Sequence, residues 1–87
     1  MILAPVVLTA LLGAAPPTPS ADSHLLTGAE AFRSEKYAVA LVEFRVAERM
    51  GSAEASWYVA ASLVKLGRAE DAVEAFALAE QIGRAHV

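Results

Sequence analysis

The stretch 70-EDAVEAFALAEQIG-83 repeats an earlier one, 38-AVALVEFRVAERMG-51, and this repetition determines the fold that we expect. The identical residues, each pair separated by 32 positions, are Ala40/Ala72, Phe44/Phe76, Ala47/Ala79, Glu48/Glu80 and Gly51/Gly83. Apolar residues replace one another at three further positions of the alignment. Self-similarity at a fixed period of this size predicts stacked supersecondary repeats.

The composition limits the class of protein. Eighty-seven residues form one small domain at most. Every charged side chain lies between Asp22 and Arg84, and the net charge of −3 gives no reason to expect nucleic acid or an anionic membrane as a partner. The absence of cysteine excludes disulfides and thiolate metal sites. Without cysteines, the sequence also gives no indication of whether the protein resides in an oxidising or a reducing compartment.

The first 21 residues differ sharply from the rest. The apolar run from Ile2 to Ala15 is shorter than the roughly 20 residues of a membrane span. Small residues and the proline-rich linker 16-PPTPS-20 follow it, as in a secretory signal peptide, although no Lys or Arg precedes it. We therefore expect residues 1–21 to be a signal peptide and linker, and the protein to be exported to the periplasm or envelope without a membrane span after signal removal. The alternatives are an apolar leader or a wrongly assigned start codon.

Four helical segments are expected after the leader, with no strand-like alternation. Apolar residues recur at spacings of three and four, which is the mark of amphipathic helices. Asp22 and Ser23 are good N-cap residues for the first helix. The polar step 34-SEK-36 separates it from the second, which we expect to end at Gly51 as a left-handed C′ residue. Ser52 is then the cap of the third helix, which stops at 67-GR-68.

Small residues at helix crossings explain why alanine replaces larger apolar side chains. A methyl group lets two helix backbones approach closely, and one aromatic ring fills the gap beside them. We expect Ala40, Ala47, Ala72 and Ala79 to be the points of close approach. Phe44 and Phe76 are then the aromatic residues that fill these gaps.

The helix–turn–helix unit, present twice, resembles the tetratricopeptide repeat family. The residues that fit the family pattern are Gly28, Tyr37, Ala40, Phe44 and Ala47 in the first copy and Ala60, Leu63, Gly67, Ala72, Phe76 and Ala79 in the second. Glu35 stands where the turn of the family often has glycine. The resemblance implies an all-α fold in which antiparallel helical hairpins stack as a short solenoid. Residues 22–52 would form the first repeat and residues 53–81 the second.

The resemblance also implies a binding surface, because the first helix of each pair in this family lines a concave groove for an extended peptide or a partner helix. Carried over, the principal groove positions are Leu25, Phe32, Arg33, Trp57, Val64 and Lys65, with Asp22, Ala29, Glu54 and Ala61 beside them. Arg33 and Lys65 lie one repeat apart and would both face an acidic partner. Aromatic residues at helical spacing are usually core, so the alternative for Phe32 and Trp57 is packing between helices.

The function that we expect is a non-catalytic scaffold of the bacterial envelope, which binds other proteins or peptides. The alternative is a purely structural piece that caps a longer helical solenoid and has no ligand of its own. In that case both aromatic rings would be buried between helices, leaving little apolar groove.

The chain is poor in catalytic and metal-ligating groups. His24 is the only histidine before the tail, and a lone histidine near a helix start is usually a capping or surface group. The spacing in 62-SLVK-65 is that of some Ser–Lys enzymes, but the partner motifs of those enzymes are missing. The acidic residues of 70-EDAVE-74 form a solvated face at a helix start. We therefore expect no catalytic residue, metal site or cofactor.

The tail 82-IGRAHV-87 matches the translation of a widely used sequencing adapter, read as ATC GGA AGA GCA CAC GTC with a stop codon after it. We expect residues 82–87 to derive from the adapter and further repeats to follow Gln81 in the natural chain. The apolar face with Val73, Phe76 and Ala77 would then lie partly exposed. The alternative is that Ile82 and Gly83 are native, since they align with Met50 and Gly51.

Overall fold

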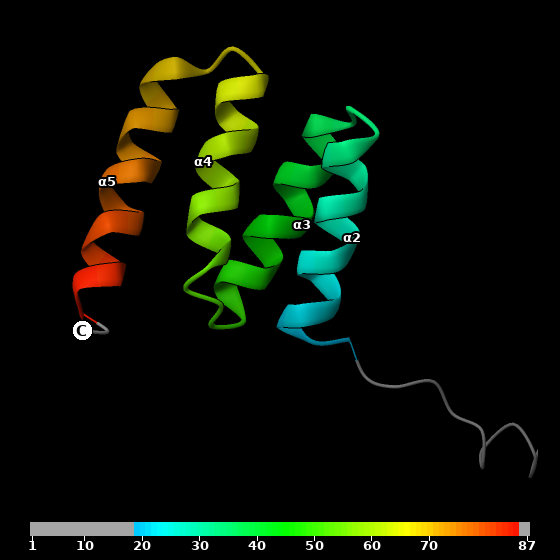
Figure 1. Ribbon diagram of the computed structural model, residues 1–87, viewed down its shortest axis with the longest axis horizontal. Helices are drawn as coiled ribbons and strands as arrows, with labels where there is room; N and C mark the ends of the chain where they lie inside the picture. The colour runs from blue at the N-terminus through cyan, green and yellow to red at the C-terminus, as the bar shows by residue number, and fades with distance from the viewer. Residues whose placement is uncertain (1–18, 86–87) are drawn as a thin grey trace, which may run out of the picture.

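The computed structural model describes residues 19–85, which form four α-helices and no strand (Figure 1). The helices are α2 (Ala21–Arg33), α3 (Tyr37–Arg49), α4 (Ala55–Lys65) and α5 (Ala69–Ala85). The predicted all-α class and the stacking of antiparallel helical hairpins are confirmed. The predictions for the apolar run of the leader and for the last two residues of the tail lie outside the described residues.

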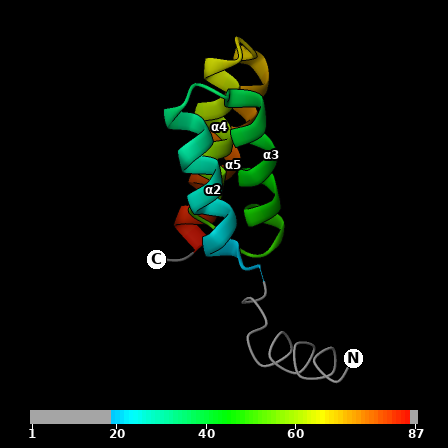
Figure 2. The ribbon, with the colours of Figure 1, turned by 90° about the vertical axis from the view of Figure 1, so that its right-hand side faces the viewer.

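Each helix packs against the next one along the chain. The contacts join α2 to α3, α3 to α4 and α4 to α5. Figure 1 shows the helices side by side, with α5 at one end of the row, and Figure 2 shows the opposite end, where α2 and α3 face the viewer. Because the helices alternate in direction, α2 and α4 run parallel to each other, and so do α3 and α5.

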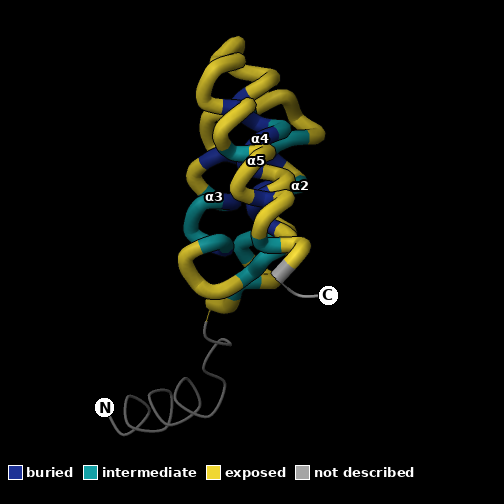
Figure 3. Tube along the Cα trace, turned by 90° about the vertical axis from the view of Figure 1, so that its left-hand side faces the viewer, coloured by how far each residue is buried: buried dark blue, intermediate teal, exposed yellow. Residues whose placement is uncertain are grey.

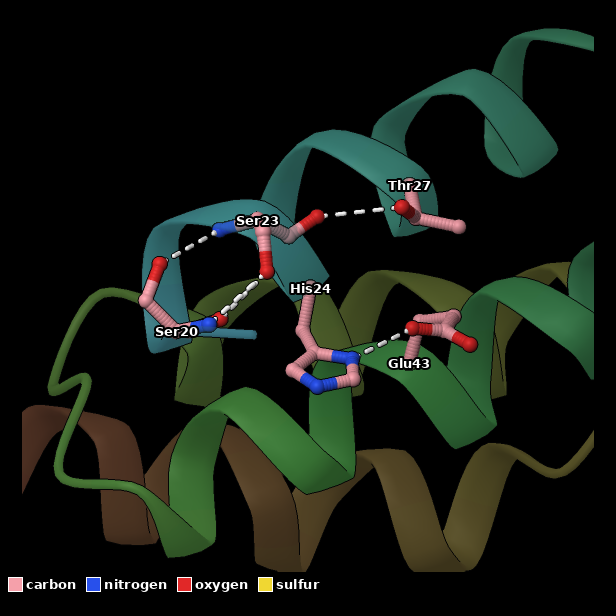
Figure 4. Close-up of polar contacts among 5 residues, drawn as sticks. All are labelled: Ser20, Ser23, His24, Thr27 and Glu43. Carbon is pink, nitrogen blue, oxygen red and sulfur yellow. Dashed lines mark hydrogen bonds and ion pairs between the residues drawn. The ribbon is translucent and has the colours of Figure 1, made fainter. Parts of the chain in front are cut away.

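The first described helix begins earlier than the sequence suggested. Its N-cap is Ser20, and the helix starts at Ala21. The backbone N–H of Ser23 donates to Oγ of Ser20 at 3.2 Å, and the N–H of Ser20 donates to Oγ of Ser23 at 2.9 Å (Figure 4). The prediction of Asp22 or Ser23 as the N-cap is therefore wrong. Ser23 is the third-position partner of a reciprocal capping box, and Asp22 lies in the first turn, where its charge favours the helix dipole.

The turns between helices use left-handed backbone at three positions. Gly51 has a φ of 100° directly after the C-cap Met50, as predicted, and Gly67 has a φ of 76° after α4. Glu35 has a φ of 60° in the first repeat, at the position equivalent to Gly67. Ser52 accepts a hydrogen bond from the N–H of Ala55 at 3.3 Å, although Glu54 occupies the N-cap position of α4.

The core contains the small residues that the repeat pattern singled out. Ala40, Ala47, Ala60, Ala72 and Ala79 are all buried. Gly28 is also buried, and a Cβ atom placed on it would lie 2.6 Å from Cε1 of Phe44. That distance is well inside van der Waals contact, so the α2 backbone lies against the Phe44 ring. Tyr37 is half-buried, and Gly67 is exposed in the turn after α4.

The two aromatic residues that were predicted to fill the gaps differ in exposure. The Phe44 side chain is 2% exposed, whereas Phe76 is 38% exposed. The reason is that α4 packs over Phe44, while no other helix within residues 19–85 covers the outer side of α5. Val73 and Ala77 are exposed with Phe76, as the sequence predicted for this face.

Candidate peptide-binding groove

A groove, which we call the α2–α4 groove, runs between the two parallel helices α2 and α4. It consists of two adjoining hollows of about 390 and 300 Å³. The larger is lined by Asp22, Leu25, Leu26, Ala29, Phe44, Glu54 and Tyr58. The smaller is lined by Ala29, Phe32, Arg33, Phe44, Tyr58 and Ala61.

The sequence forms this groove by placing small side chains between larger ones. Ala29 on α2 and Ala61 on α4 carry only methyl groups, which leaves room between the two helices. Phe44 of α3 lies at the floor of both hollows. The ring of Tyr58 stacks on it, with centroids 5.2 Å apart and an angle of 28° between the planes. The centre of the groove is therefore apolar and aromatic.

The charged residues of the groove lie at its two ends. Asp22 and Glu54 are at the N-terminal ends of α2 and α4, and Arg33 is in the last turn of α2. Because the two helices are parallel, both carboxylates are at one end and the guanidinium is at the other. The Tyr58 hydroxyl donates to Oε1 of Glu54 at 3.2 Å. This hydrogen bond and the charge of Glu54 raise the pKa of Tyr58 above its ordinary value.

Of the six principal groove positions, Leu25, Phe32 and Arg33 line this groove, and so do the four positions predicted beside them. Trp57, Val64 and Lys65 are not among the lining residues.

The α4 residues that do line the groove are the repeat equivalents of Asp22, Leu26 and Ala29, which line it from α2. Trp57 is the repeat equivalent of Leu25, but its ring lies 6.0 Å from that of Phe76. The side of α4 that faces back toward α2 carries Glu54, Tyr58 and Ala61. Sequence reasoning missed Tyr58. Its spacing of four from Glu54 and three from Ala61 was the signal that could have found it.

Phe32 and Trp57 have different surroundings. The Phe32 ring is half-buried and meets Tyr37 edge-on, with centroids 5.1 Å apart. The Trp57 side chain is 46% exposed. The alternative in which both rings are buried between helices is therefore wrong for Trp57.

His24 connects two helices instead of capping one. Its Nδ1 lies 2.7 Å from Oε2 of Glu43, so the imidazole of α2 is held against α3 (Figure 4). Both side chains are partly buried. The expectation of a capping or surface group is thus replaced by a polar contact between helices within the first repeat.

The remaining candidate groups have structural partners. Ser62 is fully buried, and its hydroxyl donates to the backbone carbonyl of Tyr58 at 2.9 Å, whereas Lys65 is exposed. The hydroxyl of Ser62 is therefore not available as a nucleophile. In the acidic first turn of α5, Asp71 pairs with Arg68 at 2.7 Å. No group of three or more His, Cys, Asp or Glu residues within the described chain is arranged to hold a metal ion.

Among the helices of residues 19–85, none combines the length and apolar character that a membrane crossing needs. A comparison of the chain with models of protein families, with curated proteins and with solved structures finds no match. The resemblance to tetratricopeptide repeats therefore stays a prediction, which depends on the repeat pattern of the sequence.

Proposed function

We propose that this protein is a non-catalytic, tetratricopeptide-like scaffold of the bacterial envelope, exported by its leader, and that it binds a peptide segment of another protein in the α2–α4 groove. The observation that carries the proposal is an apolar groove over Phe44 with acidic groups at one end and Arg33 at the other. The centre of this groove is apolar and aromatic, so binding is the function that the groove supports best.

The dimensions of the groove limit its ligand. The 13 residues of α2 rise over roughly 20 Å, a length that about six residues of extended chain cover. A cationic side chain would lie near Asp22 and Glu54, and an anionic one near Arg33. Apolar side chains between them would cover Phe44 and Tyr58, and burying each one fully would contribute about 1.5–3 kcal/mol. The end charges would select the ligand more than they strengthen its binding.

A calorimetric titration with matched peptides tests the proposal. The first peptide has Lys at one end, Glu at the other and two leucines between. Two control peptides keep the leucines but carry Lys at both ends or Glu at both ends, which also allows for binding in either direction. We expect the mixed peptide to bind most tightly. Equal affinities for all three would contradict the proposed charge recognition.

A pair of variants locates the binding. Arg33→Glu should weaken binding of the mixed peptide by about two- to fivefold, as expected for an exposed ion pair. Arg49→Glu, at an exposed position on α3 outside the groove, is the matched control and should have no effect. A flat response to all three peptides would contradict the proposal as a whole.

A structural role is the second candidate, and one observation favours it. The outer side of α2 exposes Ser23, Thr27 and Glu30. The equivalent positions of α4 are Ala55, Val59 and Ser62, which are buried against the rest of the structure. A polar outer side suits a helix at the end of a solenoid. If none of the three peptides binds in the calorimetric titration, the structural role becomes the better candidate.

A further inference from the structure

A second apolar surface lies at the other end of the row of helices, and we call it the α4–α5 end face. It comprises Trp57 and Val64 of α4 with Val73 and Phe76 of α5, all of which are exposed. Figure 3 views the structure from this end, and most of the tube of α5 is coloured as exposed. A group of large apolar side chains at one end of a small protein marks an interaction site.

The equivalent surface one repeat earlier, on α3, is covered by α4 in this structure, and we call this contact between α3 and α4 the template. Leu41 and Phe44 of α3 are the equivalents of Val73 and Phe76. The packing of α4 leaves Leu41 only 8% exposed, against 68% for Val73. The α4–α5 end face therefore repeats a surface that already binds a helix in this structure.

A polar contact of the template is repeated as well. The hydroxyl of Ser56 on α4 donates to Oε2 of Glu48 on α3 at 2.9 Å. Glu80 of α5 is the repeat equivalent of Glu48, and its carboxylate contacts the exposed Arg84 of its own helix. An incoming helix with a hydroxyl at the position of Ser56 would find the same acceptor. The two apolar residues and the carboxylate thus occur in the same order on both surfaces.

The helix that packs on α3 in the template has a recognisable composition. Ala55, Val59 and Ser62 of α4 are buried, whereas their equivalents in α2 are exposed, and Ser56 contacts Glu48 of α3. Small side chains at these positions let the two helices approach closely. Tyr58 of the same helix covers the aromatic ring of Phe44.

We propose that the α4–α5 end face binds an amphipathic helix from another polypeptide chain. The contact stripe of that helix carries small residues, a hydroxyl group directed at Glu80 and an aromatic ring that covers Phe76. This site is separate from the α2–α4 groove, so it does not depend on the proposed function.

Head-to-tail association of two copies does not satisfy this surface. Within residues 19–85 of a second copy, α2 is the first helix of a repeat whose outer side no other helix covers. Its Ser23, Thr27 and Glu30 would occupy the places of Ala55, Val59 and Ser62. Glu30 would then replace a side chain that is fully buried in the template. Burying an unpaired carboxylate is strongly unfavourable.

A synthetic peptide with the sequence of residues 53–68 is the probe, with Trp57→Phe so that the peptide does not fluoresce as tryptophan. The fluorescence of Trp57 in the full chain reports on the end face, because this ring lies beside Phe76. We expect a saturable change with a Kd on the order of 10–1000 µM, since the peptide must fold as it binds. A peptide of residues 21–36, in the same repeat register but with the polar stripe of α2, is the control and should give no change. A flat response to the first peptide, or an equal response to both, would overturn the proposal.

Two variants of the full chain confirm the location. Val73→Glu should weaken binding of the peptide by about tenfold or more, because it places a charge in the contact. Val42→Glu, at a position of α3 that is 59% exposed, is the matched control and should bind as the parent does. Circular dichroism shows whether both variants keep their helices. Equal binding by the two folded variants would overturn the proposal.

Sedimentation velocity of the chain alone tests whether a second copy of the chain covers the α4–α5 end face. We expect a monomer in both the parent and Val73→Glu. A dimer that Val73→Glu dissociates would show that a second copy covers the end face, and it would overturn the proposal of a different chain. Arg33→Glu should leave binding of the helical peptide unchanged, so a failure of the groove proposal is distinguishable from a failure of this one.

Discussion

Phe44 and Phe76 occupy equivalent positions in two copies of one repeat, yet their side chains are 2% and 38% exposed. The helices that carry them are alike in sequence, and both use alanine where they cross a neighbour. What differs is the next helix: α4 packs over Phe44, whereas no helix within residues 19–85 packs over Phe76. A repeat sequence therefore specifies the helix and its crossing points, while the burial of the outer side depends on the following helix.

The two turns within the repeats provide a second comparison. Gly67 ends α4 with a φ of 76°, and its equivalent Glu35 has nearly the same backbone with a φ of 60°. Glycine adopts this conformation without a steric penalty, while a residue with a side chain does not. The first repeat thus forms the same turn at a higher conformational cost.

The largest predicted difference between the repeats concerns the two phenylalanines. Phe44→Ala should lower the free energy of unfolding by about 3–5 kcal/mol, because it leaves a cavity under α4. Phe76→Ala should cost about 1 kcal/mol or less, because its ring is already partly in water. Urea unfolding followed by circular dichroism measures both. Equal losses would mean that the α4–α5 end face is covered in solution.

A second prediction compares a buried alanine at a helix crossing with an exposed alanine on the same helix, α5. Ala72 is buried at the crossing with α4, whereas Ala77 is exposed on the opposite side of the same helix. Ala72→Leu should overpack the crossing and cost about 1–3 kcal/mol. Ala77→Leu should change the stability by less than about 0.5 kcal/mol, as expected for a surface position. Thermal melting compares the two, and equal melting temperatures would refute the assignment of Ala72 to the crossing.

The turn comparison gives a prediction of opposite sign at two equivalent positions. Glu35→Gly should stabilise the protein by about 1 kcal/mol, because it removes a side chain from left-handed backbone. Gly67→Ala should destabilise it by about the same amount. A Cβ atom at Gly67 would have no other atom within 4 Å, so a steric clash cannot account for that loss. If Glu35→Gly proves neutral or destabilising, the two turns are not equivalent.

The sequence predicted those parts of the fold that are set locally. The spacing of apolar residues gave the four helices, and the alanines at 40, 47, 72 and 79 gave the crossings. The start of α2 was missed, because serine, aspartate and serine at 20, 22 and 23 are all good caps and only the reciprocal hydrogen bonds distinguish them. The exposure of Phe76 and Val73 agrees with the prediction for a face that lacks a neighbouring helix.

The groove was predicted only in part. Three pairs of equivalent positions line the groove from both helices, namely Asp22/Glu54, Leu26/Tyr58 and Ala29/Ala61. Other positions line it from α2 alone. Leu25 and Phe32 line the groove, whereas their equivalents Trp57 and Val64 do not, and the Trp57 ring lies beside Phe76 instead. The contact between His24 and Glu43 joins residues on different helices, and no periodicity within one helix predicts it.

The smallest effect that we predict is a change in the pKa of Tyr58 at the acidic end of the α2–α4 groove. The Tyr58 hydroxyl donates to Glu54, and the negative charge nearby disfavours the phenolate, so the pKa of Tyr58 is raised. A raised pKa in the folded state means that the contact stabilises the fold fully below the ordinary tyrosine value of about 10. This contribution is lost as the pH rises through the folded pKa.

Glu54→Gln should therefore lower the pKa of Tyr58 toward its ordinary value, and at neutral pH it should remove only the small stabilisation that this exposed contact provides. A Tyr37→Phe background leaves Tyr58 as the only tyrosine, so the ultraviolet absorbance of tyrosinate reports this group alone. The same titration also sharpens the comparison between the two surfaces. A cationic peptide end beside Glu54 should lower the pKa of Tyr58, because it offsets the carboxylate charge. The helical peptide at the α4–α5 end face should leave that pKa unchanged, and a shift caused by that peptide would mean that it binds in the α2–α4 groove.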